Sequence, residues 1–242
     1  TTISPVLAIE ESSSQLKIAT WNIQRLNEKN LENKDIEGLI KAFEKIGADV
    51  VAFQEVGSAD LMQKVVGDGY DVVISEQNET DFETMLTGFA VNKGIPFEVN
   101  DDYKALDVGG LRYGKDITLF PETEESLRLL SVHLKSYCWE KSLDDPSQDC
   151  QKLSKQINIL ETWMEDQDTK GQAFAVLGDF NRRFNLENEE AWEDLDDGEP
   201  DLVNVTAGKM SSCFDAMYPD YIDHILLGEA SSIMLQKAQW KA

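Results

Sequence analysis

Short apolar segments alternate with polar connections along the chain, and the spacing of the apolar residues predicts the elements. Alternating or continuous apolar runs predict strands at residues 16–24, 48–56, 70–75, 88–93, 116–120, 127–134, 173–181 and 221–227, with a weaker one at 232–238. Apolar residues at helical spacing predict helices at 35–46, near 58–66 and at 150–166, whereas the acidic segment 188–201 is typical of a solvated helix and loop. Because strands outnumber helices, we expect an α/β fold with two mixed or antiparallel β-sheets and helices packed outside.

Composition indicates a folded protein with a strongly acidic surface. Apolar residues make up 41% of the 242 residues, which is enough for a core, and no run of about 18 apolar residues predicts a membrane span. Lys and Arg number 22 against 46 Asp and Glu, so the formal net charge is −24. This charge excludes a broad basic surface that grips nucleic acid or anionic lipid. It leaves open a phosphate handled at one concave site, where a metal ion reverses the local potential.

Three cysteines bear on the compartment in which the protein works. Cys138 and Cys150 flank a polar loop, and a disulfide between them would stabilise the fold by about 3 kcal/mol. The alternative is two free thiols. A disulfide would favour an exported protein, because such bonds persist in oxidising compartments. Cys213 is expected to be a small apolar filler. A zinc site is not expected, since the sequence has no CxxC pair and only two His.

Several predicted strands deliver a polar group at or near their ends. Asn22 and Glu55 lie late in the first two strands, the segment GDFN at 178–181 ends a third, and Asp223 lies in the last. A single polar residue at a strand end is usually a cap or turn residue, but the Gly of GDFN permits a tight turn that exposes the acid. Two carboxylates about 4 Å apart repel by roughly 4 kcal/mol, so convergence of Glu55, Asp179 and Asp223 would favour a divalent cation. Oxygen and amide ligands point to Mg²⁺, Mn²⁺ or Ca²⁺.

The ordered set WN, QE, SVHL, GDFN and IDH resembles the endonuclease/exonuclease/phosphatase superfamily, the Mg²⁺-dependent fold of pancreatic-type deoxyribonuclease, apurinic/apyrimidinic endonucleases and sphingomyelinases. The resemblance implies a four-layer α/β sandwich with the site at one edge of its two central sheets. It runs from Leu16 onward, so we expect an irregular segment at 1–15 and a single domain at 16–242. The stretch HLKSYC…C…LGDFNRR is similar to exported bacterial members of unassigned substrate, in which the two Cys are thought to pair. That similarity implies a secreted or periplasmic protein, which we expect to be a monomer.

The resemblance also implies a role for each residue that matches a family motif. Glu55 matches the principal metal-ligand Glu, and Asn22 matches the Asn that supports the metal-and-phosphate cluster and is counted with the metal site. His133 matches the His that hydrogen-bonds the scissile phosphate in the deoxyribonuclease branch. Asp179 matches the Asp that handles water or leaving-group protons, and Asn181 matches the Asn that steadies the phosphate.

Four further matches are looser. Arg112 lies where many members place a phosphate-contacting Arg, and Asp223 matches a catalytic Asp that orients a final His. Arg182 is expected to bind phosphate, and Arg183 could also reach the substrate. Together with Lys135 these arginines would make a small local positive field. The alternative for each Arg is a solvated surface charge.

Two departures from the family pattern limit the resemblance. Gln24 stands where abasic-site enzymes usually carry an Asp, which argues against a base-excision enzyme. The family pattern ends in Ser-Asp-His, but neither Asp nor His follows His224. We therefore expect the sequence to stop short of the final strand and its Ser-Asp-His motif. His224 is a poor substitute, because neighbouring residues of a strand point to opposite faces; we expect it to pack in the core beside Asp223.

The expected function is that of a metal-dependent phosphodiesterase, using Mg²⁺, Mn²⁺ or Ca²⁺, that acts on nucleic acid as a transient substrate. One alternative is a phosphomonoesterase or a lipid phosphodiesterase of the same family. The polar loops at 76–84 and 140–149 argue against a lipid substrate. Another alternative is a non-enzymatic binding module, and the missing Ser-Asp-His is the feature that supports it. Substrate class depends on loops and not on the fold.

Overall fold

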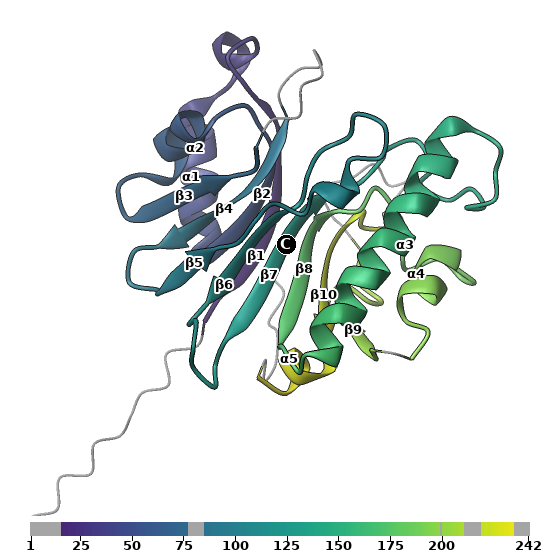
Figure 1. Ribbon diagram of the computed structural model, residues 1–242. Coiled ribbons are helices and arrows are strands. Elements are labelled where there is room, and N and C mark those ends of the chain that lie inside the picture. Colours follow the sequence, from purple (N-terminus) through teal and green to yellow (C-terminus); the bar gives the residue numbers. More distant parts are fainter. Residues whose placement is uncertain (1–15, 77–84, 199, 211–218, 235–242) are drawn as a thin grey trace, which may run out of the picture.

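Two β-sheets lie face to face at the centre of the protein (Figure 1). The computed structural model describes residues 16–76, 85–198, 200–210 and 219–234. The four-stranded sheet has the order β1-β2-β4-β3 and contains β1 (Ile18–Leu26), β2 (Val50–Val56), β3 (Tyr70–Ile74) and β4 (Leu86–Asn92). The six-stranded sheet has the order β5-β6-β7-β8-β10-β9 and contains β5 (Phe97–Val99), β6 (Lys115–Leu119), β7 (Leu127–His133), β8 (Phe174–Asp179), β9 (Leu202–Asn204) and β10 (Asp223–Gly228). Each sheet contains one parallel pair, β1 with β2 and β7 with β8, and the other pairs are antiparallel.

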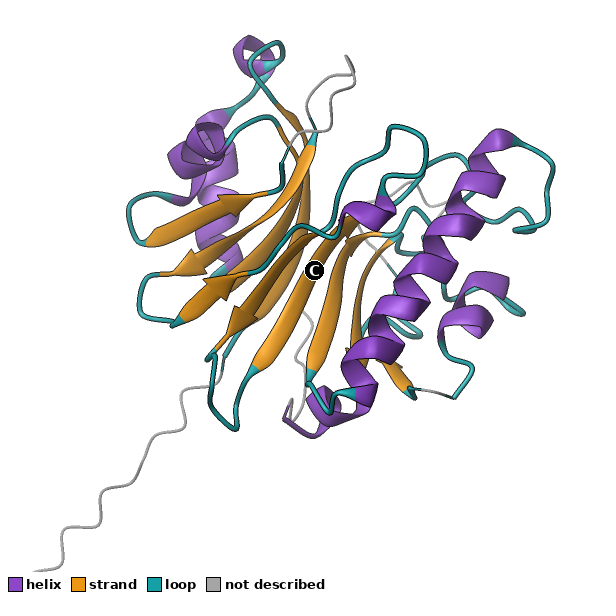
Figure 2. Ribbon diagram, in the orientation of Figure 1, coloured by secondary structure: helices purple, strands orange, loops and turns teal. Residues whose placement is uncertain are grey.

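Helices cover the outer face of each sheet (Figure 2). On the four-stranded sheet lie α1 (Ile36–Ile46) and α2 (Ala59–Val66), and on the six-stranded sheet lie α3 (Gln148–Thr169) and α4 (Glu190–Leu195). The short α5 (Glu229–Met234) follows β10, and two single-turn 3₁₀ helices are η1 (Leu31–Asn33) and η2 (Lys104–Leu106). None of these helices, which are those of the described residues, has the length and apolar character needed to cross a bilayer.

Three separate cores hold the layers together. Val50 of β2 packs with Leu129 and Leu177 between the sheets. Outside the four-stranded sheet, Phe53 of β2 packs against α1 and α2. Outside the six-stranded sheet, α3 contributes Ile157 to the third core. A strand such as β2 is therefore buried on both faces, which is why its sequence is a nearly continuous apolar run. The α/β prediction of a four-layer sandwich with two mixed sheets between helices is confirmed.

Local signals in the sequence explain where the first two helices begin and end. The Asp35 carboxylate accepts a hydrogen bond from the Gly38 N–H at 2.9 Å, and the Ser58 hydroxyl does the same for Leu61 at 3.3 Å. Both are N-cap residues, which satisfy backbone donors that have no partner inside the helix. At the other end of α1, Gly47 adopts φ 56°, a left-handed conformation that glycine tolerates. These turns fix how each helix returns to the sheet.

One element differs from its prediction, and the short elements β5, β9, η1 and η2 were not predicted. The weak strand expected at 232–238 is wrong over residues 232–234, which lie in α5. Gly228 ends β10 where a Cβ would meet the Phe174 ring at 2.5 Å, and Ser231 donates to the Phe174 carbonyl, so the chain folds back over β8 as a helix. β5 and β9 have three residues each, too few to show a period. The predicted segment 1–15, Cys213 and the rest of 232–238 lie outside the described residues.

Candidate active site

Strand pairing brings polar residues of both sheets to one edge. β1 and β2 run parallel, and Asn22 pairs with Gln54, directly before Glu55. In the other sheet His133 of β7 and Asp223 of β10 both pair with Asp179, the last residue of β8. We call Glu55, His133, Asp179 and Asp223 the acidic edge. Its members come from four strands, so that only the packing of one sheet on the other assembles them.

The Asn22 side chain joins the two sheets at this edge. Its Nδ2 donates to Glu55 Oε1 at 3.2 Å and to Asp179 Oδ2 at 2.9 Å. Its Oδ1 accepts from the Gln24 backbone N–H at 3.0 Å, which orients the amide. In this arrangement Asn22 presents N–H groups to the carboxylates, so it supports the cluster and does not offer its oxygen as a ligand there.

His133 lies between the two carboxylates. Its Nε2 is 3.5 Å from Asp179 Oδ2 and 3.9 Å from Glu55 Oε1. Burial, reinforced by the positive charge of Arg112, lowers the pKa of His133 well below its usual value. The imidazole is therefore neutral near pH 7, with one nitrogen able to accept and the other able to donate. Its Nδ1 is buried and has no hydrogen-bond partner among the described residues.

Crowding of acids disfavours their charged forms. Burial, opposed by hydrogen bonds from the Asn181 N–H and Asn22, raises the pKa of Asp179 to about 6, and the nearby charge of Glu55 adds to the rise. Burial, then Asp179 and Glu55, raise the pKa of Asp223 well above its ordinary value. Its Oδ1 is a buried acceptor with no hydrogen-bond partner in the part of the chain that the structure describes. These carboxylates need a proton or a cation.

The donor set fits a divalent cation. Glu55, His133 and Asp179 each offer one ligand atom, and these atoms lie within 4.8 Å of one another. Carboxylate oxygen and neutral imidazole are common ligands of divalent metals in proteins. The orphaned oxygen of Asp223 adds an acceptor at the same edge. The identity of the ion is not fixed by these donors, because both oxygen and nitrogen are present.

Two residues of the motif GDFN, at the end of β8, have a positive φ angle. Gly178 has φ 149°, and a Cβ there would lie 2.0 Å from the Val132 carbonyl oxygen. Asn181 has φ 52°, and its N–H donates to Asp179 Oδ1 at 2.8 Å. Because Gly178 has no side chain, β7 can approach β8 closely. This approach places Asp179 beside His133. The prediction that this Gly permits a tight turn exposing the acid is wrong, because Gly178 lies inside β8 and Asp179 is buried, 4% exposed.

The side chain of Asn181 is held from two sides. Its Nδ2 donates to the Leu134 carbonyl at 3.0 Å, and its Oδ1 accepts from Trp139 Nε1 at 3.2 Å. Trp139 belongs to no motif that the sequence comparison used. The signal that points to it is an aromatic residue directly after Cys138, in the loop that follows the His133 strand.

Arg112 lies near the acidic edge, as expected. Burial lowers the pKa of its guanidinium, whereas the charges of Glu55 and Asp179 raise it. Arg112 is half-buried, and its charge also acts on His133. Its positive charge thus acts on the carboxylates and on the imidazole of the acidic edge.

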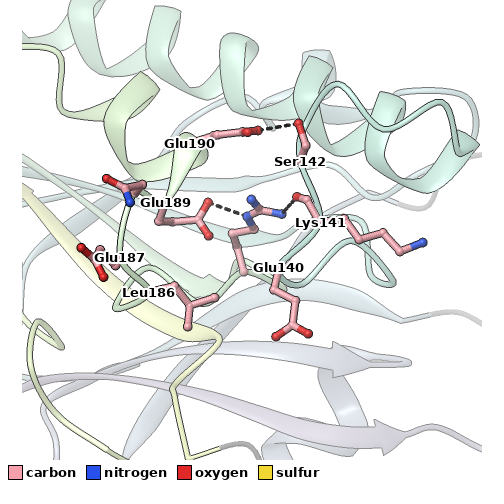
Figure 3. A pocket seen from close by; sticks show the side chains of 9 residues that line it. Glu140, Lys141, Ser142, Leu186, Glu187, Glu189 and Glu190 are labelled. Carbon is pink, nitrogen blue, oxygen red and sulfur yellow. Dashed lines mark hydrogen bonds and ion pairs between the residues drawn. The ribbon is translucent and has the colours of Figure 1, made fainter.

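The prediction that Arg182 binds phosphate is wrong. Its side chain is 2% exposed and its donors are used inside the protein. Nε donates to Glu189 Oε1 at 2.6 Å, as Figure 3 shows for Glu189, and Nη1 donates to the carbonyls of Cys138 and Lys141 at 2.6 Å each. The pocket in Figure 3 is lined by Arg182 and by acidic residues such as Glu187, none of which belongs to the acidic edge.

The other predicted cations are also paired. Arg183 Nη1 lies 3.0 Å from Glu140, and Lys135 Nζ lies 2.7 Å from Asp149. Their contribution to a local positive field is therefore smaller than expected, because each carries its counter-charge with it.

His224 is a packing residue, as its place in the strand predicts. It is fully buried, its Nδ1 lies 2.6 Å from Thr206 Oγ1, and its Nε2 lies 2.8 Å from the Arg182 carbonyl. Its ring stacks on Phe184 at 4.3 Å between centroids. His224 pairs with Gly178 on the ladder while Asp223 pairs with Asp179, so the two side chains leave opposite faces. We call Arg182, Glu189 and His224 the Arg182 network.

Cys138 and Cys150 form a disulfide. The bond ties the loop after β7 to the first turn of α3, and both cysteines are fully buried. The structure thereby decides between the bridge and the two free thiols that the spacing left open.

Comparison with known proteins agrees with this geometry. The model of the Endonuclease/Exonuclease/phosphatase family matches residues 19–233. The chain belongs to this family. A search of the curated proteins finds no match for it. This membership confirms the resemblance carried by the strand-end motifs.

Solved structures of the same fold include enzymes from several organisms. Truncated TDP2 from Caenorhabditis elegans superposes with a TM-score of 0.63 at 16% identity, over 88% of this chain and 83% of that one. The Neisseria 3′ phosphatase NExo, bound to a product DNA hairpin, superposes with a TM-score of 0.59 at 19% identity, over 89% of this chain and 88% of that one. A Bacteroides thetaiotaomicron member of the family gives 0.60 at 12% identity, over 88% and 83%. At such identities these likenesses show the fold alone.

Proposed function

We propose that the protein is a divalent-metal-dependent phosphoester hydrolase and that its substrate is a nucleic acid. The observation that carries the proposal is the cluster of Glu55, His133 and Asp179, whose ligand atoms lie within 4.8 Å of one another. The family to which the chain belongs contains endonucleases, exonucleases and phosphatases. All of these hydrolyse phosphoester bonds, and this cluster has the donors that such chemistry uses.

Glu55, Asp179 and His133 are the residues that would hold the cation, and Asn22 would keep the two carboxylates in place. A bound Mg²⁺ or Mn²⁺ would polarise the phosphoryl oxygens and offset their growing negative charge. Burial, and after it the charges of Asp179 and Glu55, raise the pKa of Asp223, and a cation at this position would offset the part due to those charges.

The chain's own residues would orient the substrate and move the proton. Asn181 uses one amide hydrogen on Leu134 and has a second hydrogen for a phosphoryl oxygen. The positive charge of Arg112, which acts on His133, would also attract this group. Asp179 is placed to orient or deprotonate a water for in-line attack, a role that carries a large part of the rate.

One observation supports nucleic acid as the substrate. The structural relative NExo is described as a 3′ phosphatase bound to a product DNA hairpin. The net charge of −24 argues against tight binding of a duplex, but it leaves turnover at a local site open. The same relative supports a second candidate, a phosphomonoesterase that removes a terminal phosphate from DNA.

Metal binding and turnover should be measured separately. Isothermal titration with Mg²⁺ and with Mn²⁺ tests the cluster, using Glu55→Gln as the variant and the exposed Glu98→Gln of β5 as the matched control. Hydrolysis of single-stranded DNA, bis(para-nitrophenyl) phosphate and para-nitrophenyl phosphate tests the reaction, each with and without EDTA. We expect one binding event that Glu55→Gln removes and Glu98→Gln keeps.

We expect Asp179→Asn to lower kcat/KM by about 10²–10⁴-fold, the usual contribution of a positioned acid–base group. Activity on the diester would identify a phosphodiesterase, and activity confined to the monoester would identify the second candidate. Metal binding that Glu55→Gln leaves unchanged, together with EDTA-insensitive or absent hydrolysis of all three substrates, would show that the family scaffold serves a non-enzymatic role here.

We further propose that the protein works outside the cytosol. The support is the buried Cys138–Cys150 disulfide, because such bonds persist in oxidising compartments. Intact mass of the protein from its native source, measured before and after reductant, should show the oxidised form first. Recovery of two free thiols would contradict export.

A further inference from the structure

Two aromatic side chains stand exposed beside the acidic edge. Tyr137 keeps 64% of its surface in solvent and Trp139 keeps 37%. Their ring centroids are 5.4 Å apart and the rings are tilted by 47°. Aromatic rings bury the largest apolar areas in a fold, so an exposed pair of this kind on a strongly acidic surface calls for a physical reason.

The loop that carries the pair is held rigidly. Tyr137 has φ 73°, a left-handed conformation that is rare and costly for an aromatic residue. On one side of it Lys135 pairs with Asp149 at 2.7 Å, and on the other side Cys138 is bonded to Cys150. Such strain persists only where the surroundings impose it. The fold therefore fixes Tyr137 in an exposed position where its ring adds little to the core.

The pair is connected to the acidic edge through one side chain. Trp139 Nε1 donates to Asn181 Oδ1 at 3.2 Å, and the Asn181 N–H donates to Asp179 Oδ1 at 2.8 Å. A ligand that stacks on Trp139 or Tyr137 would thus lie next to the group that we assign to the phosphoryl oxygen. The indole also fixes the rotamer of Asn181, so Trp139 acts as a positioning residue.

The chemistry of the pair favours a flat aromatic ligand attached to a phosphate. Every nucleobase has a π-face that stacks on Tyr or Trp without regard to sequence. Lys135 Nζ, which pairs with Asp149, lies 5.1 Å from the centroid of the Tyr137 ring and helps to hold that ring in place. Stacking needs no broad basic surface, and it therefore suits a chain of net charge −24.

We propose that Tyr137 and Trp139 form a stacking platform for an unpaired nucleobase next to the scissile phosphate. The substrate is then single-stranded or frayed nucleic acid, in which a base is free to leave its own stack. This inference rests on the proposed function, because the phosphate must be at the acidic edge for the base to reach the platform.

Equilibrium binding tests the platform without any turnover. Fluorescence anisotropy in EDTA compares a labelled oligothymidylate with an abasic strand of the same length. We expect wild type to prefer the base-bearing strand by roughly tenfold, the lower end of what stacking on an aromatic contributes. Tyr137→Ala should abolish that preference and Tyr137→Phe should keep it. Met210→Ala, at a residue 70% exposed outside the loop, is the matched control and should behave as wild type.

Trp139→Phe tests the positioning role, since it keeps a ring and removes the N–H that holds Asn181. We expect kcat for bis(para-nitrophenyl) phosphate to fall by about fivefold, the effect of one lost hydrogen bond, with KM little changed. Preference for the base-bearing strand and the thermal midpoint should stay near wild type. An unchanged kcat would overturn the positioning role.

The outcomes separate this inference from the proposed function. Equal binding of both strands by wild type, or equal weakening of both by Tyr137→Ala, would overturn the platform while metal binding at Glu55 and diester hydrolysis still stood. The platform would also be overturned if Tyr137→Ala weakened the binding of a sugar phosphate but left the binding of the oligonucleotide unchanged. If wild type preferred the base-bearing strand but neither bound metal nor hydrolysed the diester, the proposed function would be refuted instead.

Discussion

The acidic edge and the Arg182 network are built from neighbouring residues, yet their polar atoms are treated in opposite ways. In the Arg182 network both nitrogens of His224 have partners, and Nε and Nη1 of Arg182 donate to protein acceptors. At the acidic edge, Asp223 Oδ1 and His133 Nδ1 are buried without a hydrogen-bond partner among the described residues.

This difference separates a structural network from a candidate site. Leaving a buried polar group unpaired costs free energy, and most such groups in folded proteins have a partner. Single unpaired atoms also occur elsewhere in the described residues, as at Trp163 Nε1, whereas at the acidic edge two of them lie beside a cluster that fits a cation. The satisfied network ties the GDFN turn to the loop of Cys138 and to α4. At the acidic edge, the unpaired donors and acceptors are available for a cation and a phosphate. Functional sites commonly keep such groups even though they lower the stability of the fold.

The largest expected effect would break this comparison from its structural side. Arg182→Met should lower the free energy of unfolding by about 3–5 kcal/mol, because Glu189 is left as a buried, unpaired acid. Burial already raises the pKa of Glu189 against the effect of Arg182. Urea unfolding measures the loss, and the folded fraction should keep its Mg²⁺ affinity. The double variant Arg182→Met/Glu189→Met is the control and should recover much of the stability. Equal stability of wild type and the single variant would contradict the structural role.

The second effect is a pH dependence that arises in the same network. Burial lowers the pKa of His224 from its usual range to about 4, although hydrogen bonds to the backbone oppose the shift. The unfolded chain thus takes up this proton at a higher pH than the folded protein does. The His224 contribution to the free energy of unfolding should therefore fall by roughly 3 kcal/mol as the pH drops from about 6.5 to about 4, whereas Asp179 and Asp223, whose pKa values burial raises, act in the opposite direction.

Chemical denaturation at a series of pH values tests this slope. His224→Gln carries no titrating group at the position, so its unfolding free energy should depend less on pH over the same window. An identical slope in the variant would show that other groups, such as His133, account for the whole acid sensitivity.

The smallest effect sharpens the comparison from the side of the acidic edge. Mg²⁺ at a hundredfold excess over its Kd should stabilise the folded protein by about 2.7 kcal/mol, because it binds the folded state and not the unfolded one. The thermal midpoint of wild type and of Arg182→Met should therefore rise with Mg²⁺. Asp179→Asn should show little or no rise. A shift that persists in Asp179→Asn would place the ion elsewhere.

Long periodic segments made the fold predictable, whereas short segments did not. The helix at 35–46 and the strand at 127–134 show their period over many residues, and both appear as α1 and β7. The three-residue strands β5 and β9 have too few positions to show one. At the C-terminal side, the apolar residues of 232–234 looked like a strand but form part of α5, because Gly228 and Phe174 turn the chain there.

At the candidate site, the motifs predicted the convergence better than the individual roles. The strand ends predicted that Glu55, Asp179 and Asp223 would converge, and parallel pairing does align the carboxyl ends of β1 with β2 and of β7 with β8. The cluster of possible ligands consists of Glu55, His133 and Asp179, and Asp223 pairs with Asp179 beside it. Arg182 follows the same motif by one residue and turns into the core. Trp139 carries no motif, and only its hydrogen bond to Asn181 reveals it.

The amino-acid sequence by itself determined the order of the strands and helices, the family and the residues available for catalysis. Backbone period, caps and turn residues act locally, so they are legible along the chain. Only the tertiary structure decided which polar residues lie at the acidic edge and which form hydrogen bonds inside the core. Asp223 and His224 are adjacent in the chain, but the pleat sends one to the acidic edge and the other into the core. The physical reason is that the partners which satisfy a buried polar group come from distant segments brought together by packing.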